Sequence, residues 1–380
     1  MFENTVFGKI DANLQKAIFD AGYRRPTPIQ TAAIPHLLAR KDMIGCASTG
    51  TGKTAAFMLP ILHHLLRVRK PRRIGHPRAL VLSPTRELAV QTAQCIGRYS
   101  SHVSLPYACL IGGVSQVNQV KDIKKGAETY VACPGRLIDL MTQGIVYLDQ
   151  VECFVLDEAD RMLDMGFMPD VKRLMSKLPR KRQTMLFSAT MPKDVRELAN
   201  EFLSDSVEIS VSPGKPTVDE ISQYAIFSRN SEKDQKLIKL LRNRQSWKKV
   251  VVFTKMRHGA DKVNRKLLRA GISSAAIHSD KTQNQRTRAL EGFRRGDIRV
   301  LVATDIASRG IDVPNVSGVI NMSLPLDMES YVHRIGRTAR AGESGIAISF
   351  VSEEEKKHLK NIERFIRKTI RVLKDENETF

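Results

Sequence analysis

The chain alternates short apolar runs rich in β-branched residues with longer stretches of helical periodicity, and this alternation constrains its fold more than any other feature. Short apolar strands that are each followed by a helix predict βαβ units and a parallel sheet covered on both faces. The first half is therefore expected to be an α/β domain. Its predicted strands are 79–84, 130–134, 153–160 and 184–190, and helical patterns follow the first two at 85–99 and 135–144.

The alternation is interrupted once and then resumes. Residues 212–220, SPGKPTVDE, hold two prolines and a glycine and are predicted to be a linker. A helical pattern over 352–373, with a plausible cap at Ser352, predicts a C-terminal helix. We therefore expect two doubly wound parallel-sheet domains in tandem. Further strands are predicted at 249–254, 274–278 and 298–304, with a helix at 258–270.

The chain carries a formal net charge of +21, and both halves are basic. Residues 218–380 hold 32 Lys and Arg against 20 Asp and Glu, which leaves 29 against 20 in residues 1–217. Such a charge suits a polyanion such as nucleic acid, although charge that only favours solubility is an equal alternative.

The five cysteines show no CxxC spacing, which favours reduced thiols in the cytoplasm over a zinc site. No apolar stretch is long enough to predict a membrane span, and the N-terminus shows no secretion signal.

Residues 47–54, ASTGTGKT, match a phosphate-binding loop except that alanine replaces the first glycine. Gly50 and Gly52 let the backbone turn its N–H groups toward phosphate oxygens. Lys53 can reach the β- and γ-phosphates, and the Thr54 hydroxyl can ligate Mg²⁺. A predicted strand precedes the loop and a predicted helix follows it, which is the context that a phosphate loop requires.

Residues 154–160, FVLDEAD, end a buried-strand pattern in three acids. Asp157 is placed to supply a carboxylate to a metal beside the phosphate loop, and Glu158 to orient or deprotonate an attacking water. The alternative is that Asp157 or Asp160 caps the helix that follows.

ASTGTGKT, PTREL (84–88), DEAD (157–160), SAT (188–190) and HRIGRTAR (333–340) occur in the order typical of one family. The chain resembles the DEAD-box family of ATP-dependent RNA helicases, most closely the bacterial RhlE-like branch. The resemblance implies two RecA-like domains, residues 1–211 and 221–380, and implies ATP and Mg²⁺ as cofactors.

The resemblance extends to nucleotide contacts. It implies that GYRRPTPIQ (22–30) reads adenine, with the Gln30 amide bonding N6 and N7, whereas an ordinary exposed glutamine is the alternative. Phe7 resembles the aromatic that packs at the adenine, and Asp312 resembles an acid that contacts the ribose. The implied nucleotide-binding residues are Phe7, Tyr23, Arg25, Thr27, Gln30, Ala47, Ser48, Thr49, Gly50, Thr51, Gly52, Lys53, Thr54 and Asp312.

The resemblance also implies RNA contacts to the backbone, so that binding tolerates any sequence and 2′-hydroxyl contacts favour RNA. Cys133 stands where the family usually has threonine. For each lone basic residue a solvated surface charge is the alternative, and for the loop 67–78 it is the preferred interpretation. The implied RNA-contacting residues are Pro84, Thr85, Arg86, Gly112, Gly113, Gly135, Arg136, Thr254, Gln283, Arg286, Thr304 and Asp305.

Arg337 and Arg340 resemble the arginines that stabilise the transferring γ-phosphate. His333 is expected to link that phosphate to the SAT segment, where Ser188, Thr190 and Asp160 couple ATP to RNA. The expected activity is RNA-stimulated ATP hydrolysis in the cleft between the domains, with local separation of short RNA duplexes or remodelling of RNA–protein complexes. An RNA annealer or clamp without turnover and a DNA helicase are the rival classes.

Overall fold

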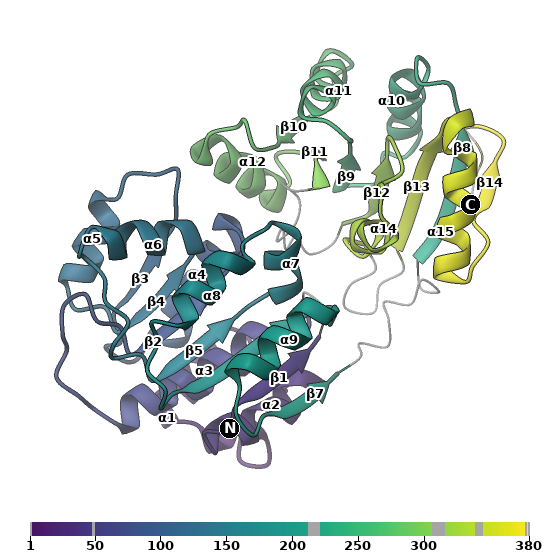
Figure 1. Ribbon diagram of the computed structural model, residues 1–380. Coiled ribbons are helices and arrows are strands. Elements are labelled where there is room, and N and C mark those ends of the chain that lie inside the picture. Colours follow the sequence, from purple (N-terminus) through teal and green to yellow (C-terminus); the bar gives the residue numbers. More distant parts are fainter. Residues whose placement is uncertain are drawn as a thin grey trace. The chain divides into compact units, whose positions relative to one another are not determined.

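The computed structural model describes residues 2–47, 50–211, 221–305, 316–338, 345–376 and 378. The chain divides into two compact units, Met1–Pro213 and Gly214–Phe380, and each is described by itself (Figure 1). Each unit is built on one seven-stranded sheet whose strands all pair in parallel. The two α/β units confirm the predicted fold class, whereas the predicted linker, 212–220, lies outside the described residues.

The first sheet has the strand order β3-β4-β2-β5-β6-β1-β7. In this order β6 lies between β1 and β5, so the segments that follow these three strands meet at one edge. The strands are β1 (Met43–Cys46), β2 (Ala79–Leu82), β3 (Tyr107–Leu110), β4 (Thr129–Ala132), β5 (Cys153–Leu156), β6 (Gln183–Ser188) and β7 (Val207–Ser210).

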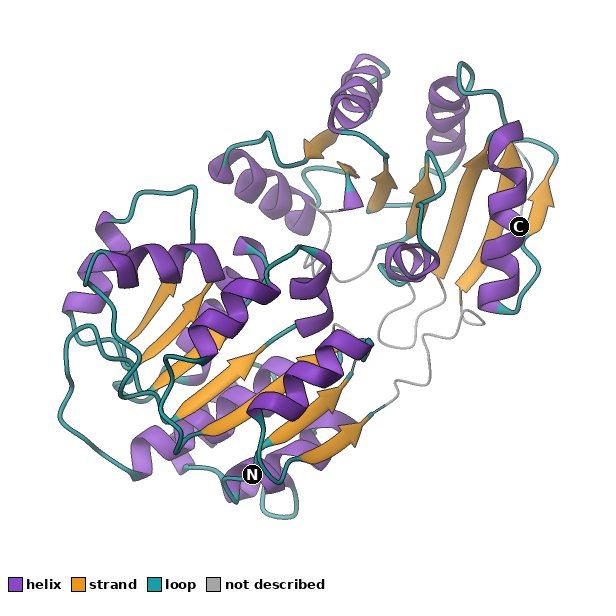
Figure 2. Ribbon diagram, in the orientation of Figure 1, coloured by secondary structure: helices purple, strands orange, loops and turns teal. Residues whose placement is uncertain are grey.

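Helices cover both faces of this sheet because alternate strand residues point to opposite sides. Val81 and Val155 pack in one core with α1–α4, whereas Leu80 and Phe154 pack in a second core with α5–α9. Figure 2 shows helices on both faces of the sheet. The helices are η1 (Val6–Lys9), α1 (Ala12–Asp20), α2 (Pro28–Leu38), α3 (Lys53–Arg67), α4 (Arg86–Tyr99), α5 (Val117–Lys124), α6 (Pro134–Thr142), α7 (Ala159–Asp164), α8 (Met168–Met175) and α9 (Lys193–Phe202).

The second unit repeats this plan with the order β10-β11-β9-β12-β13-β8-β14. Its strands are β8 (Ile221–Phe227), β9 (Val250–Phe253), β10 (Ser274–Ile277), β11 (Val300–Ala303), β12 (Gly318–Asn321), β13 (Gly345–Val351) and β14 (Arg371–Leu373). Its described helices are α10 (Lys233–Asn243), α11 (Arg257–Arg269), α12 (Gln283–Arg295), α14 (Met328–Ile335), η2 (Glu353–Glu355) and α15 (Lys356–Ile366).

The predicted C-terminal helix over 352–373 is wrong beyond Ile366. The helix ends there because Arg367 adopts a left-handed conformation, with φ 55°. The chain then forms β14, which pairs in parallel with β8 and buries Leu373. Strand pairing with a partner far away in the sequence overrides the local helical pattern, which is a common reason for such errors.

A buried ion network fastens the amino ends of β2, β4 and β5 to one another. The Arg78 side chain is 5% exposed and contacts Glu128 at 3.2 Å and Glu152 at 2.6 Å. Burial by itself raises the pKa of Glu152, yet hydrogen bonds from His64 and Arg78 hold that pKa well below its ordinary value. Removing one partner of a buried pair is costly, since it leaves the other charge uncompensated.

We expect Arg78→Ala to lower the free energy of unfolding of the first unit by about 3–5 kcal/mol, because two partly buried carboxylates lose their shared cation. Circular dichroism measures the unfolding of both units. The fluorescence of Trp247, the one tryptophan of the chain, follows only the second unit, in which it lies. Arg69→Ala, a change at an exposed arginine, is the matched control. An equal loss in both variants, or a shift only in the Trp247 transition, would contradict the expectation.

Candidate functional site: a nucleotide site and an RNA-facing edge

The predicted phosphate loop connects β1 to α3. Gly50 and Gly52 have positive φ values of 83° and 95°, a conformation that glycine adopts without strain. The buried Ala47 donates its N–H to the Ser188 carbonyl at 3.0 Å, which fixes the start of the loop against β6. α3 begins at Lys53 without an acidic residue in its first turn, so its N-terminus is open to an anion. Ser48 and Thr49 lie outside the described residues.

Lys53 and Asp157 each bury a charged atom that lacks a hydrogen bond to any described residue. Lys53 is 6% exposed and Asp157 is 2% exposed. Within the described residues, neither Lys53 Nζ nor Asp157 Oδ1 has a hydrogen-bond partner. Burial raises the pKa of Asp157 to about 6, an effect that Lys53 opposes and the neighbouring Glu158 reinforces. Buried groups are normally paired, so this pair is suited to a phosphate and a metal ion.

Glu158 has a left-handed backbone, with φ 53°, directly before α7. Its carboxylate forms an ion pair with Arg161, which lies three residues later, within α7. A non-glycine residue in this region of backbone space stores strain, and such strain concentrates at functional sites. The Arg161 contact gives the predicted water-orienting carboxylate a defined direction.

Asp160 connects the DEAD segment to the SAT segment. Its Oδ2 accepts hydrogen bonds from the Thr190 N–H at 2.8 Å and the Thr190 hydroxyl at 2.9 Å. Its own N–H donates to the Ser188 hydroxyl at 3.1 Å. The side chain of Glu158, the N-cap residue of α7, makes no capping hydrogen bond, whereas Asp160 Oδ1 accepts the Arg161 N–H at 3.0 Å. Asp160 therefore also satisfies one N–H of the first turn of α7, as the alternative expected. The structure brings together the three residues predicted to couple the two segments.

The Gln30 amide lies beside the phosphate loop. Gln30 is 1% exposed, accepts the Thr27 N–H at 2.9 Å and donates to the Gly52 carbonyl at 3.1 Å. The alternative of an ordinary exposed glutamine is therefore wrong. Because Gln30 is held by one acceptor and one donor contact, the same amide can exchange them for the N6 donor and N7 acceptor of adenine.

Among the other residues of the predicted adenine segment, Thr27 also lies at the phosphate loop, since its Oγ1 would be 3.0 Å from a Cβ at Gly52. Phe7 is completely buried and packs edge-on to Tyr23, whose hydroxyl lies 2.6 Å from that of Tyr99. Phe7 thus belongs to the core behind the segment, while Arg25 is exposed. Contact of Phe7 with an adenine stays a prediction.

The predicted RNA contacts of the first unit follow β2, β3 and β4, at the same edge as the nucleotide site. Thr85 caps α4 by accepting the Leu88 N–H at 3.4 Å. The Arg86 guanidinium covers Gly113, where an added Cβ would lie 2.0 Å from Arg86 Nη1. The Arg136 guanidinium donates to the Val114 carbonyl at 3.4 Å, so both arginines converge on the turn that follows β3.

Three further positions near these contacts differ in how open they are to a ligand. Gly135 is exposed at the start of α6, with open space where a Cβ would be, so a ligand backbone can approach it closely. Burial raises the pKa of the Cys133 thiol to about 12, so the thiol stays protonated and does not replace the missing threonine hydroxyl with a charge. Pro84 is buried directly after β2.

In the second unit, Thr254 and Thr304 follow the neighbouring strands β9 and β11, and the Thr254 N–H donates to the Ala303 carbonyl at 2.9 Å. Gln283 and Arg286 lie in the first turn of α12. The carboxylate of Asp305 is held by Arg334 through bonds of 2.5 and 2.7 Å. The pairing fixes the direction of the Asp305 carboxylate, and contact of Asp305 with RNA stays a prediction.

Arg334 is a residue that the sequence interpretation missed. It is 3% exposed and also donates to Asn321 Oδ1 at 3.1 Å and the Ser323 carbonyl at 2.7 Å. It thereby fastens α14, which carries His333, to the ends of β11 and β12. The HRIGRTAR segment was the available signal, but only its phosphate-directed residues were assigned. Arg337 directly follows this helix, whereas Arg340 and Asp312 lie outside the described residues.

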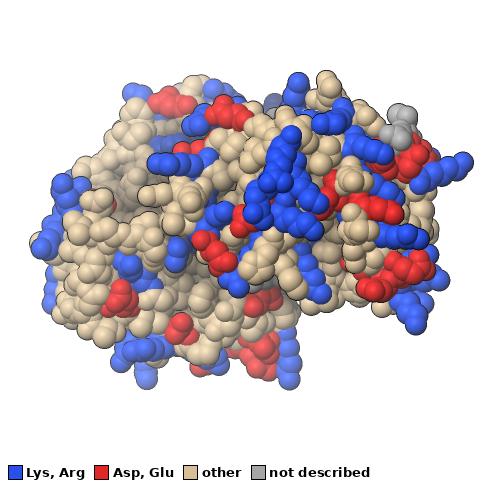
Figure 3. Space-filling view, turned by 90° about the horizontal axis from the view of Figure 1, so that it is seen from above, with Lys and Arg blue, Asp and Glu red and all other residues tan. Residues whose placement is uncertain are grey.

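Lys and Arg side chains are spread over the visible face of the protein, with acids between them (Figure 3). Within the described residues no cluster of three or more His, Cys, Asp or Glu side chains is arranged to hold a metal. All five cysteines are free thiols. Among the described helices, none combines the length and the apolar character that a membrane crossing needs.

Comparisons with known proteins agree with this geometry. The DEAD/DEAH box helicase family matches residues 27–198, and the helicase conserved C-terminal domain matches residues 232–342. The chain is 42% identical to the ATP-dependent RNA helicase RhlB of Pseudomonas syringae, over 92% of this chain and 89% of that protein. It is 43% identical to the ATP-dependent RNA helicase DeaD of Mycobacterium tuberculosis, over 95% of this chain but 63% of that protein.

Other relatives are longer still, and the chain spans 44% of a probable ATP-dependent RNA helicase, ddx17, of Dictyostelium discoideum, at 41% identity. Among solved structures, that of Dbp5 from S. cerevisiae bound to RNA and ADP BeF3 is similar, with a TM-score of 0.84 and 31% identity over 96% of this chain and 94% of that chain. The RhlE-like branch stays a prediction. The match across both units shows that the chain belongs to the DEAD-box family of ATP-dependent RNA helicases.

Proposed function

We propose that the chain hydrolyses ATP with Mg²⁺ when RNA is bound, and that it uses this cycle to separate short RNA duplexes locally or to remodel RNA–protein complexes. The observation that carries the proposal is the pair of buried charged atoms, Lys53 Nζ and Asp157 Oδ1, which have no hydrogen-bond partner in the described part of the chain and lie beside an open helix N-terminus. A phosphate and a cation satisfy both atoms at once, and their burial has no other evident use.

The roles of the residues follow from their positions. Lys53 neutralises charge on the β- and γ-phosphates, and Gln30 selects adenine over guanine through its acceptor and donor atoms. Thr54 and Asp157 are placed to hold Mg²⁺, which supplies further neutralisation of phosphate charge. Glu158, directed by Arg161, orients the attacking water.

Coupling to RNA uses segments that follow the carboxyl ends of neighbouring strands in the first unit. Asp160 joins the segment after β5 to the segment after β6, so a displacement of either changes the position of Glu158 or of Thr190. Arg337 and Arg340 of the second unit are assigned to the γ-phosphate, where they stabilise charge in the transition state. By thermodynamic linkage, RNA then tightens ATP binding by the same factor as ATP tightens RNA binding.

RNA is held mainly through its backbone. Arg86, which lies over Gly113, and Arg136 contribute charge, while Gly135 allows close approach of the strand. The free thiols and the two substrates favour a cytoplasmic location. Proteins of RNA processing or ribosome assembly are the protein partners that such an activity implies.

The direct test is the ATP hydrolysis rate with and without single-stranded RNA, with GTP and a DNA strand in parallel. We expect RNA to stimulate hydrolysis of ATP, and GTP or DNA to be poor substitutes. Glu158→Gln should lower kcat about 10²–10⁴-fold, because the attacking water loses its base, while ATP and RNA binding persist. Equal rates with and without RNA, or full strand-separating turnover in Glu158→Gln, would refute the proposal.

Asp157→Asn should abolish hydrolysis and yet stabilise the first unit by about 1–3 kcal/mol at neutral pH. The pKa of Asp157 is raised from 3.8 to about 6 in the fold, so its ionised form opposes folding above pH 6 and has no effect below the unfolded value. The stabilisation should therefore shrink as the pH falls from about 6 to 4. Melting curves without nucleotide at several pH values measure it, and a variant less stable than the parent at pH 8 would contradict the assignment.

Gly113→Ala should weaken RNA binding about tenfold, because its Cβ would displace the Arg86 guanidinium that contacts phosphate. Gly166→Ala is a matched control, since Gly166 has nearly the same φ, 73° against 72°, but open space around it. Both variants should lose about 1 kcal/mol of stability from backbone strain. The measurement is the RNA concentration that half-saturates ATP hydrolysis, and equal values for both variants would count against a role for Arg86.

A further inference from the structure

The amino-terminal edge of the first sheet carries a surface that the helicase motifs do not use. Because all strands are parallel, this edge lies opposite the nucleotide and RNA motifs, roughly 13 Å away along a four-residue strand. The loops 68–78, 143–152 and 176–182 enter β2, β5 and β6 here, and we call them the amino-edge surface. They hold two acids, Asp149 and Glu152, against nine cations: Arg69, Lys70, Arg72, Arg73, Arg78, Lys177, Arg180, Lys181 and Arg182.

The first of these loops is built to a defined shape. Gly75 has a φ of 82°, and its carbonyl accepts the Tyr147 N–H at 2.9 Å. A Cβ at Gly75 would lie 2.6 Å from the Ile145 carbonyl oxygen, so the two loops are in close backbone contact. The His76 ring stacks on Tyr147 with centroids 4.8 Å apart and an interplanar angle of 13°. A loop that only carried solvated charge would need none of these contacts.

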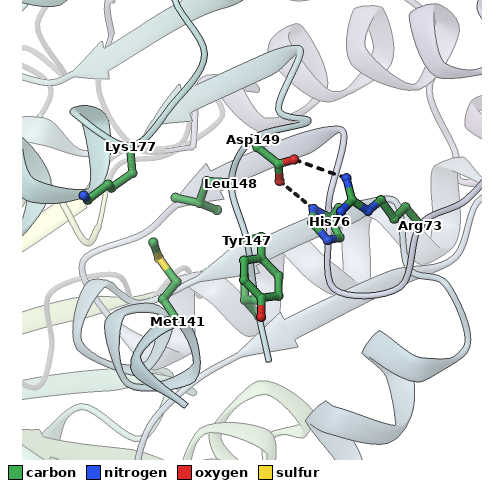
Figure 4. Close-up of a pocket in the computed structure, with 8 residues that line it drawn as sticks. Arg73, His76, Met141, Tyr147, Leu148, Asp149 and Lys177 are labelled. Atoms are coloured by element: carbon green, nitrogen blue, oxygen red, sulfur yellow. Dashed lines mark hydrogen bonds and ion pairs between the residues drawn. The ribbon is translucent and has the colours of Figure 1, made fainter. Parts of the chain in front are cut away.

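These two loops, the end of α6 and Lys177 line an open pocket of about 600 Å³. In Figure 4, Tyr147 stands between the Met141 and Lys177 side chains on one side and the Arg73–His76 pair on the other. The residue Tyr147 is 49% exposed although its ring is stacked on His76, so part of its surface remains open to a ligand. The pocket thus combines an exposed aromatic ring with flanking cations.

Several cations of the amino-edge surface are not neutralised by an acid among the described residues. Within the described residues, Arg69, Lys177, Arg180 and Lys181 form no ion pair, and Arg73 reaches Asp149 only at 3.4 Å. Asp149 also contacts His76 at 2.5 Å, so the one acid in the pocket is already engaged. Electrostatic attraction for a polyanion is therefore not cancelled locally.

A basic pocket at the amino-terminal edge of the second sheet is a useful contrast. There Arg242 donates to the Ala270 carbonyl and Lys249 donates to the Arg294 carbonyl, at the C-terminal ends of α11 and α12. These cations compensate helix ends, as is common for the last turn of a helix. No exposed aromatic ring lines that pocket.

We propose that the amino-edge surface is a second RNA-binding site, in which a base stacks on Tyr147 and the flanking phosphates contact Arg73 and Lys177. Stacking on an aromatic ring between cations binds single strands without regard to sequence. The site tethers the protein to a longer RNA while the motif edge acts on a neighbouring segment. The proposal adds to the proposed function only a second contact with the same polymer.

The test compares a short strand of about 10 nucleotides, which fills one site, with a long strand of about 40 nucleotides, which can reach both. The variants are Tyr147→Ala and the double variant Arg73→Gln/Lys177→Gln. Each should leave kcat and the half-saturating concentration unchanged with the short strand, and raise the half-saturating concentration about tenfold with the long strand. The double variant should also reduce the salt dependence of long-strand affinity, by a slope of about 1.4 for two lost phosphate contacts.

Lys16→Gln/Lys360→Gln is the matched control, because it removes the same charge from two exposed lysines elsewhere. Ultraviolet crosslinking of the long strand to the unaltered chain gives a second measure, with a crosslinked peptide that contains Tyr147 expected. The proposal fails if the variants match the control, if short and long strands are affected equally, or if no crosslink reaches Tyr147. Long-strand affinity kept by every variant would instead assign the surface to an acidic protein segment. Absence of short-strand stimulation in the unaltered chain would refute the proposed function and leave the crosslinking result to judge the second site.

Discussion

The parallel pairing of every strand is the constraint on which the rest of this structure depends. It places all carboxyl ends of the first sheet at one edge, so the phosphate loop after β1, the acids after β5 and the SAT segment after β6 become neighbours. It also separates the two edges of the sheet completely. Chemistry at one edge and an independent surface at the other are consequences of the same pairing.

The nucleotide site contains several features that lower the stability of the fold. Lys53 Nζ and Asp157 Oδ1 are buried and have no hydrogen-bond partner among the described residues, and Glu158 has a strained left-handed backbone. Each feature is unfavourable for the isolated fold, and each is offset by the large cores on both faces of the sheet. The contrast with Arg78 is instructive, since that buried charge has two carboxylate partners and belongs to the scaffold.

The positive charge of the chain is used in three physically different ways. Arg78 and Arg334 are buried and join secondary-structure elements to one another. Arg242 neutralises a helix end. Arg86 and Arg73 lie at surfaces where glycine turns or an aromatic ring give a ligand close access. Net charge alone does not distinguish these uses, because they differ only in burial and in neighbours.

Much of the fold and site could be predicted from sequence, because strand–helix alternation and motif order are local properties. The sequence alone determined the two α/β units, the phosphate loop around Lys53 and the acids from Asp157 onward. Tertiary structure decided what depends on distant partners: the strand at Arg371–Leu373, the Arg334–Asp305 pair and the surface around Tyr147. Local patterns record what a segment prefers, whereas pairing, burial and charge compensation are set by residues that only the folded chain brings together.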